Sequence, residues 1–345
     1  MQRVAIGNSG LTLPRIVFGT SCLGNQYQRV PDETKFEIVR KWFEYGDLPV
    51  YLDTAGKYGA GLALESIGNN LRRLKVLPER VVVSNKLGWK RVPLRGGTST
   101  FEPGVWADLK YDAELCISSD GIVDCWREGS ELIGSPYVMQ LVSVHDPDEY
   151  LDAASSRGER QRRLANIFDA YRALIGLKQQ GKVQAVGVGC KNWQVARLVA
   201  ETVPLDWAML ANSLTIYRHP PDVVRFIEEL AARGVAVINS AVFHAGFLTG
   251  GSFFDYRIAD PDEDREKFAW REALQTLCRR HAVSPMTVCV QFALSPPGVS
   301  AIALNTSRPG RIGENVAAVE TAVPLAFWLD AKDSGLIARD YPYVG

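Results

Sequence analysis

The sequence predicts an α/β chain folded as one (β/α)₈ barrel. Eight short runs rich in β-branched and apolar residues alternate with longer segments of helical periodicity, which is typical of parallel strands joined by helices. The chain has 345 residues, enough for a barrel of about 250 residues with long loops added. No internal repeat, linker or low-complexity segment divides it. Residues 1–345 are therefore expected to form a single domain.

The predicted strands are recognised by their short apolar runs and the turn residues that bound them. A hairpin-like start precedes the first strand. Val81, Val82 and Val83 give the third strand the continuous apolar pattern of a strand buried on both faces. In chain order the predicted strands are residues 16–19, 50–54, 80–84, 137–144, 183–189, 207–211, 235–239 and 299–304.

The predicted helices are recognised by apolar residues spaced along one face. In the first helix Phe36, Val39 and Phe43 have this spacing, and Asp32 is the expected N-cap. Gly181 and Gly234 are expected to end two of the later helices. In chain order the predicted helices are residues 32–45, 62–74, 163–180, 194–201, 222–233, 265–281 and 310–319.

Three longer segments are predicted as loops at the carboxyl-terminal face of the barrel. Residues 89–120 and 245–264 are rich in glycine or charge, and residues 146–159 follow a strand end. Long loops in compact domains are usually functional or mobile. These segments are therefore expected to shape the substrate site.

Composition excludes several classes of protein. The 39 basic and 39 acidic residues balance, whereas nucleic-acid-binding proteins usually carry a basic excess. No apolar run approaches the roughly 20 residues of a membrane span, and the N-terminus lacks a signal peptide. The six cysteines include no CxxC pair, so we expect reduced thiols in a cytoplasmic protein, without a metal site. The oligomeric state is left open.

Four ionisable residues follow three consecutive predicted strands. Asp53, Lys86 and His145 end the second, third and fourth strands, and Tyr58 lies five positions after Asp53. The carboxyl ends of barrel strands meet at one mouth, so these side chains are expected to converge there.

The combination suits one kind of chemistry. A lysine cation would lower the pKa of a tyrosine from its usual value of about 10. An aspartate would hold that lysine charged, and a histidine could donate to a substrate oxygen or relay a proton. Alone, each residue could equally cap a turn, pack or remain solvated. Together they favour proton transfer coupled to hydride transfer at a carbonyl or carbinol carbon.

The motif Asp-Thr-Ala-x-x-Tyr-Gly at residues 53–59, followed by strands ending in Lys and His, resembles the aldo-keto reductases. The resemblance runs from Leu13-Pro14 to the segment 309–315. It implies an NAD(P)-dependent (β/α)₈ barrel without a metal or a Rossmann fold. It also implies that Tyr58 is the acid/base, that Lys86 and Asp53 tune it, and that His145 orients the substrate.

The resemblance further implies a cofactor site around residues 305–315, which open the last core helix, because a helix N-terminus suits a phosphate. Arg311 and Asn315 match the adenosine-phosphate loop of the family, but Asn305 replaces its usual lysine. NAD is therefore favoured over NADP, unless Arg308 compensates. The residues implied to bind the cofactor are Gly19, Thr20, Asp53, Asn212, Ser240, Phe243, Asn305, Thr306, Ser307, Arg311, Glu314 and Asn315.

The segments 145–148, 187–189 and 336–337 resemble one branch of the family, the L-fucose, D-threo-aldose and L-galactose 1-dehydrogenases. That branch implies oxidation of an aldose of the L-fucose, L-galactose or D-arabinose type at C1 to the lactone, with Tyr58 as base. Trp89 and Trp126 are expected to wall the substrate pocket beside Tyr58 and His145. Two alternatives stay open: a pyridoxal 4-dehydrogenase or an aldehyde or ketone reductase using the same four residues, and a cofactor-binding regulatory subunit.

Overall fold

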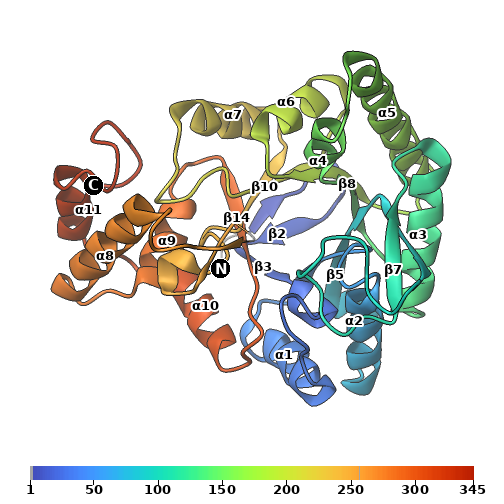
Figure 1. Ribbon diagram of the computed structural model, residues 1–345, viewed down its shortest axis with the longest axis horizontal. Helices are drawn as coiled ribbons and strands as arrows, with labels where there is room; N and C mark the ends of the chain where they lie inside the picture. The colour runs from blue at the N-terminus through green and yellow to red at the C-terminus, as the bar shows by residue number, and fades with distance from the viewer. Residues whose placement is uncertain (1–2, 256) are drawn as a thin grey trace.

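The computed structural model describes residues 3–255 and 257–345. Within them, eight parallel strands close into a barrel surrounded by helices (Figure 1), and the predicted (β/α)₈ fold is confirmed. In order around the barrel, the strands are β3 (Ile16–Gly19), β4 (Val50–Ala55), β5 (Val81–Leu87), β8 (Leu141–His145), β9 (Ala185–Cys190), β10 (Trp207–Ala211), β11 (Ala236–Ser240) and β14 (Val299–Leu304).

The helices cover the outer face of the barrel, with α8, α11 and the C-terminus at one side of the molecule (Figure 1). The structure has helices where the sequence predicted none: α3, α4, α9 and α11. The helices are α1 (Asp32–Tyr45), α2 (Leu62–Arg73), α3 (Ser119–Ile133), α4 (Pro147–Asp152), α5 (Arg157–Gln179), α6 (Trp193–Thr202), α7 (Pro221–Ala232), α8 (Arg265–Arg280), α9 (Pro285–Ala293), α10 (Arg311–Glu320) and α11 (Leu325–Asp333). None of them has both the length and the apolar composition that crossing a membrane requires, as judged over the described residues.

Several local expectations were wrong. The segment 146–159 contains α4 and the start of α5, and the segment 245–264 contains a short antiparallel pair, β12 (Phe253–Phe254) and β13 (Arg257–Ile258). Asp32 is the first residue of α1, and Pro31 occupies the N-cap position without a side-chain hydrogen bond. The segment 89–120 is not a simple loop. It contains an antiparallel hairpin, β6 (Trp89–Pro93) and β7 (Tyr111–Leu115), and α3 begins at its end. We call residues 89–115 the β6–β7 excursion. Its pairing was missed because the polar residues between the two strands hide their alternation.

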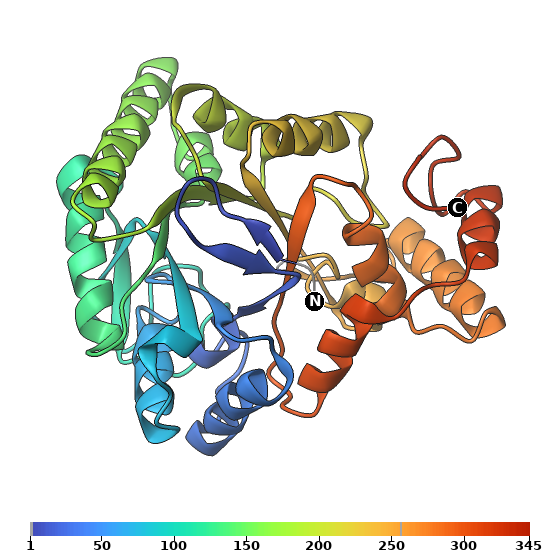
Figure 2. The same ribbon diagram turned by 180° about the vertical axis from the view of Figure 1, so that it is seen from behind.

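The interior of the barrel is filled by every second residue of its strands. One buried cluster joins Tyr51, Val82 and Trp207 inside the barrel to Ile6 and Leu13. The last two belong to the N-terminal hairpin of β1 (Arg3–Ala5) and β2 (Thr12–Pro14), which lies across one end of the barrel (Figure 2). This hairpin closes the amino-terminal end, so the cavity opens at the other end.

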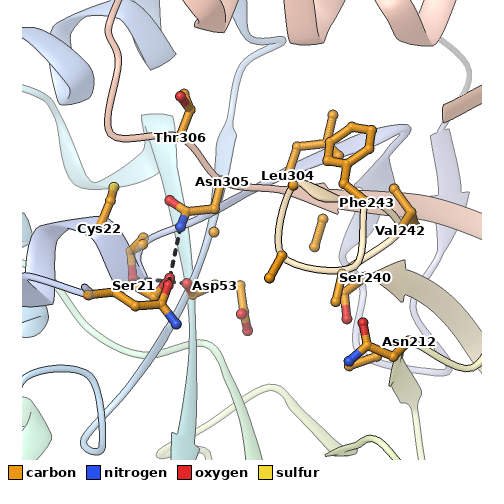
Figure 3. A pocket seen from close by; sticks show the side chains of 18 of the residues that line it. Ser21, Cys22, Asp53, Asn212, Ser240, Val242, Phe243, Leu304, Asn305 and Thr306 are labelled. Atoms are coloured by element: carbon orange, nitrogen blue, oxygen red, sulfur yellow. Dashed lines mark hydrogen bonds between the residues drawn. The ribbon is translucent and has the colours of Figure 1, made fainter. Parts of the chain in front are cut away.

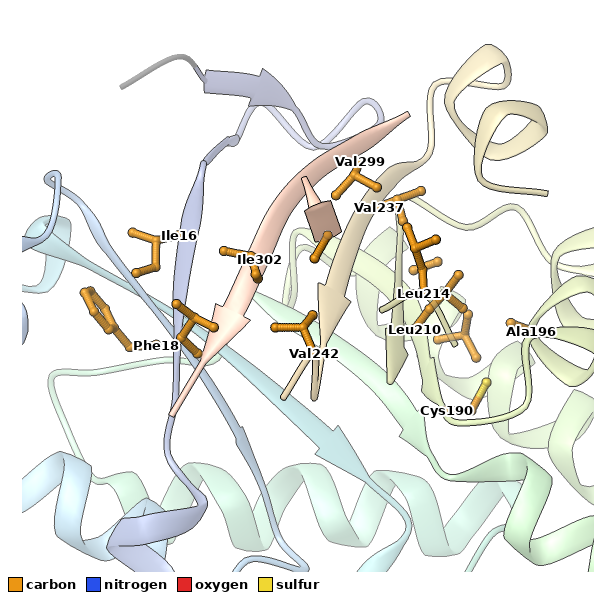
Figure 4. Packing of buried hydrophobic residues seen from close by; sticks show 14 of the residues in the cluster. Ile16, Phe18, Cys190, Ala196, Leu210, Leu214, Val237, Val242, Val299 and Ile302 are labelled. Carbon is orange, nitrogen blue, oxygen red and sulfur yellow. The ribbon is translucent and has the colours of Figure 1, made fainter. Parts of the chain in front are cut away.

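The alternate residues point outward and form the larger core beneath the helices. Figure 4 shows part of it, with Phe18, Val237 and Ile302 on strands of the barrel. Strands buried on both faces explain the near-continuous apolar runs that made them recognisable in the sequence.

Two glycines of β9 make room inside the barrel. A Cβ at Gly187 would lie 2.3 Å from the Trp207 ring, and one at Gly189 would lie 2.9 Å from Cδ of Lys86. The Gly187-Val188-Gly189 sequence is thus explained by close side-chain packing in the barrel.

Gly187→Ala should therefore destabilise the protein, by about 1–3 kcal/mol, because the added methyl group overpacks the core against Trp207. The matched control is Gly176→Ala in α5, where a Cβ meets nothing within 4 Å. The control should stabilise the helix by about 0.5–1 kcal/mol. Urea denaturation of both variants measures the difference, and equal midpoints would contradict the packing argument.

Candidate active site

Three consecutive barrel strands bring Asp53, Lys86 and His145 to the same mouth. In the parallel register, Asp53 lies beside Ser84, Lys86 beside Ser143, and His145 beside Gly189. The three residues have the same parity along their strands as the interior residues Tyr51, Val82 and Leu141, so their side chains point into the barrel. The predicted convergence is therefore present in the structure.

Lys86 and Asp53 form a buried ion pair. Nζ of Lys86 lies 2.5 Å from Oδ2 of Asp53, and both residues are at most 4% exposed. Burial raises the pKa of Asp53, and the Lys86 cation opposes that rise. Because each partner would be costly to bury alone, the pair fixes the position of both side chains.

Tyr58 lies on the loop after β4, directly above this pair. Nζ of Lys86 lies 4.9 Å from the centroid of the Tyr58 ring. The ring centroids of Tyr58 and His145 are 5.7 Å apart, and the two rings meet edge-on. The loop packs so closely that a Cβ at Gly24 would lie 2.7 Å from the Tyr58 backbone. The tyrosine, the lysine and the histidine therefore share one small space.

The electrostatics of Tyr58 differ from expectation. Its pKa is raised well above the usual value, first by enclosure away from solvent and then by the negative charges of Asp53 and Asp146. The expected lowering of this pKa is wrong, because enclosure and the neighbouring carboxylates outweigh the effect of the cations. Lys57 is the cation that opposes the rise. Tyr58 is accordingly a protonated phenol at neutral pH.

His145 is a neutral imidazole in this setting. Burial, followed by the nearby cations Lys57 and Lys86, lowers its pKa well below the usual value. Its Nδ1 atom is buried without a hydrogen-bond partner among the described residues, and its Nε2 lies 3.5 Å from Oδ2 of Asp146. A neutral imidazole keeps one N–H, which can donate to a substrate oxygen.

A cavity of about 620 Å³ joins these four residues to the start of α10. All the residues that the family resemblance assigned to the cofactor line it, and Figure 3 shows several of them around the opening. Asn305 donates from Nδ2 to the Ser21 hydroxyl over 2.8 Å. The buried Oδ1 of Asn212 has no partner among the described residues. A volume of this size is typical of small-molecule sites.

Two expected wall residues do not line this cavity. Trp89 lies on β6, with its ring against Phe101 and beneath Nζ of Lys57. Trp126 lies on α3, where Nζ of Lys182 is 5.5 Å from its ring centroid. Gly88, at a φ of +125°, separates β5 from β6, and Trp89 starts the excursion. The tryptophan that lines the cavity is Trp106 of the excursion, whose ring centroid is 5.8 Å from the ring centroid of Tyr58.

Lys57 is the main functional residue that sequence reasoning missed, although it stands inside the Asp-Thr-Ala-x-x-Tyr-Gly motif. Its side chain is 4% exposed, and Nζ lies 2.6 Å from Glu102, 3.1 Å from Asp146 and 3.1 Å from Glu149. Glu102 belongs to the β6–β7 excursion, whereas Asp146 follows β8 and Glu149 lies in α4. One lysine thus ties the excursion to the barrel beside Tyr58.

Comparison with known proteins places the chain among relatives of full length. The model of the aldo/keto reductase family matches residues 15–328. A pyridoxal 4-dehydrogenase from Microbacterium luteolum is 27% identical over 98% of each chain. A D-threo-aldose 1-dehydrogenase from a Pseudomonas species is 24% identical over 96% of this chain and 97% of that one. A solved glycerol dehydrogenase from Gluconobacter oxydans shares the fold, with a TM-score of 0.71, 18% identity, and coverage of 99% of this chain and 96% of that one.

Replacing Lys57 by methionine should release the excursion, because Glu102 and Asp146 would then lose the cation that joins them, while Glu149 keeps its ion pair with Lys191. The free energy of unfolding should fall by about 2 kcal/mol, less than for a fully enclosed pair because Glu149 is half-exposed. Trypsin should also cleave faster after the exposed Arg95 in the excursion.

Lys57→Arg is the matched control, since it keeps the charge and should leave both measurements near those of the parent protein. If the two variants lose the same stability, the ion pairs do not hold the excursion.

Proposed function

The chain belongs to the aldo/keto reductase family and is an NAD(P)-dependent oxidoreductase, and from that premise we propose that it oxidises the ring form of an aldose at C1 to the lactone. The observation that carries the proposal is the grouping of Tyr58, Lys86 and His145 at the mouth of a cavity with a strongly polar outer end. In the ring form, C1 bears both a hydrogen and a hydroxyl group. Oxidation removes the hydrogen as hydride and the hydroxyl hydrogen as a proton.

The outer end of the cavity favours a substrate rich in hydroxyl groups. A second cavity of about 420 Å³ adjoins it and shares Glu102, Lys191 and Asp255 with the first. Carboxylates accept hydrogen bonds from hydroxyl groups, and ammonium and guanidinium groups donate to them. Trp106 adds an aromatic face against which the apolar side of a sugar ring can pack.

The residues at the other end fit a nicotinamide dinucleotide. Asn212 lines the cavity, and its amide oxygen, which has no partner among the described residues, is suited to accept from a carboxamide. The N-cap of α10, Gly310, supplies no side-chain hydrogen bond, and Arg308 and Arg311 line the cavity beside it. A helix N-terminus with two cations suits phosphate groups. When bound, the cofactor supplies the acceptor for the hydride.

The protein's own part in the reaction is to hold the substrate oxygen and move its proton. His145 is neutral and orients the C1 hydroxyl group, while the Tyr58 oxygen accepts its proton. Since the pKa of Tyr58 is raised, the fraction able to accept a proton grows with pH, and oxidation should accelerate as the solution becomes alkaline. Reduction of a carbonyl group uses the protonated phenol and should not require alkaline conditions.

Oxidation of pyridoxal is the second candidate, supported by the relative from Microbacterium luteolum. Pyridoxal carries an aldehyde beside a hydroxymethyl group and closes into a ring hemiacetal, as an aldose does. The same transfer of hydride and proton would therefore give a lactone from either compound. Trp106 could pack against the pyridine ring as well as against a sugar.

A panel assay tests the proposal. L-fucose, L-galactose, D-arabinose and pyridoxal are each offered with NAD and with NADP at mildly alkaline pH, and nicotinamide reduction is followed by absorbance. Turnover of a sugar would support the aldose proposal, and turnover of pyridoxal alone would replace it by the second candidate. Tight cofactor binding without turnover of any substrate would contradict both and favour a regulatory subunit.

Tyr58→Phe should reduce turnover by about 10²–10⁴-fold, because it removes the group that exchanges the proton. The cofactor dissociation constant, measured by fluorescence titration, should stay near that of the parent protein. Tyr45→Phe, which removes a hydroxyl group from the exposed face of α1, is the matched control and should retain full activity. If Tyr58→Phe keeps most of its activity, another group is the acid/base.

We expect an NAD preference, because Asn305 lacks the charge that a 2′-phosphate would attract. Asn305→Lys should raise the ratio of kcat/KM for NADP to that for NAD by about tenfold, equivalent to about 1.4 kcal/mol from one charge-assisted contact.

Asn305→Met is the control, since it also loses the hydrogen bond to Ser21 but adds no charge. An unchanged ratio in Asn305→Lys would place the 2′-position elsewhere.

A further inference from the structure

Two cysteines meet where the β6–β7 excursion rejoins the barrel. Cys116 directly follows β7, and Cys125 lies in the second turn of α3. Their sulfur atoms are 3.2 Å apart. Cys116 is partly exposed, whereas Cys125 is 4% exposed. The other four cysteines are buried.

The surroundings of the pair join the excursion to α3. The Cys116 N–H donates to the carbonyl oxygen of Gly88 over 2.8 Å. Lys90 of β6 forms a 3.0 Å ion pair with Asp124, next to Cys125. The Arg91 N–H donates to Glu128 of α3 over 3.0 Å. The two sulfurs thus lie at the junction between elements that only noncovalent contacts hold together.

The two thiols are chemically unequal. Hydrogen bonding from Cys125, and the nearby Lys90 cation, lower the pKa of Cys116. The same hydrogen bond and burial raise the pKa of Cys125. A partly exposed thiol that ionises readily, beside a buried one held as a thiol, is the arrangement of a nucleophilic and a resolving cysteine.

We propose that Cys116 and Cys125 are a reversible oxidation site, at which a hydroperoxide converts the two thiols into an intramolecular disulfide. The sulfur of Cys116 attacks the terminal oxygen of the peroxide, the O–O bond breaks, and an alcohol leaves, or water when the oxidant is hydrogen peroxide. Cys116 is then a sulfenic acid. The sulfur of Cys125 attacks the Cys116 sulfur, the S–O bond breaks, and the hydroxyl group leaves as water with the proton of Cys125. The two sulfurs lose two electrons and the peroxide gains them.

The disulfide acts on the substrate end of the cavity. Bonding brings the sulfurs from 3.2 Å to about 2.0 Å, which draws the end of β7 and α3 together. The excursion supplies Glu102, Val105 and Trp106 to the cavity, whereas the cofactor end is built from other segments. Oxidation should therefore raise KM for the substrate, by about threefold or more, while the cofactor dissociation constant stays unchanged.

The thiol count tests the site without relying on the proposed substrate. The protein is treated with hydrogen peroxide, denatured and alkylated. Its six reactive thiols should become four, and dithiothreitol should restore all six. Cys116 and Cys125 share the tryptic peptide of residues 111–127, whose mass should fall by two hydrogens. Six alkylated thiols after peroxide treatment would overturn the proposal.

Variants separate this pair from general oxidation. Cys116→Ser and Cys125→Ser should each lose the two-hydrogen change and the effect of peroxide on KM, while keeping the activity of the reduced protein. Cys289→Ala, which removes a fully buried thiol in α9, should behave like the parent. A disulfide that forms without changing KM would overturn the link to the cavity. If peroxide still raises KM in Cys116→Ser, the effect belongs to other residues.

Discussion

The buried ion pair between Lys86 and Asp53 is the interaction on which the site depends. Neither charge is stable in the barrel without the other, so neighbouring strands must bring both side chains within contact inside the barrel. The parallel register does this, and Gly189 on the facing side of Lys86 leaves the space that the lysine stem needs. A shift of one residue in any of these strands would turn its side chain out toward the helices. The chemistry of the mouth therefore follows from the closure of the barrel.

Because Asp53 satisfies Lys86, the tyrosine must be tuned by other charges. Lys57 opposes the rise in the pKa of Tyr58 and favours the neutral form of His145. The same lysine holds Glu102 of the excursion. Lys57 thus both closes the substrate end of the cavity and shifts the pKa values of Tyr58 and His145. A displacement of the excursion changes both the shape of the cavity and the charge around Tyr58.

The parts of the molecule that sequence reasoning found and missed differ in a physical way. Strands such as β10 and β14 are buried on both faces, and a short continuous apolar run reveals them locally. The places of Asp53, Lys86 and His145 could be predicted because each residue stands at the end of such an apolar run. The pairing of β6 with β7 joins residues separated by a long polar stretch, so no local pattern reveals it. Lys57 was missed because its three carboxylate partners come from different elements. Trp89 was predicted at the cavity because it lies three residues after Lys86 in the sequence. The turn at Gly88 instead directs the chain into β6, away from the cavity.

The two ends of the cavity draw mainly on different segments of the chain. The cofactor end takes most of its residues from β10, β11, β14 and the start of α10, and the substrate end takes Lys57, Glu102 and Asp146 from segments that follow β4, β6 and β8. The reacting groups lie between them, on strands held in fixed register. Changes in the excursion can therefore alter which compound is held without disturbing the phosphate end, and Asn305 can change without disturbing the excursion. Regulation at Cys116 and Cys125 follows the same division, since both lie where the excursion meets α3.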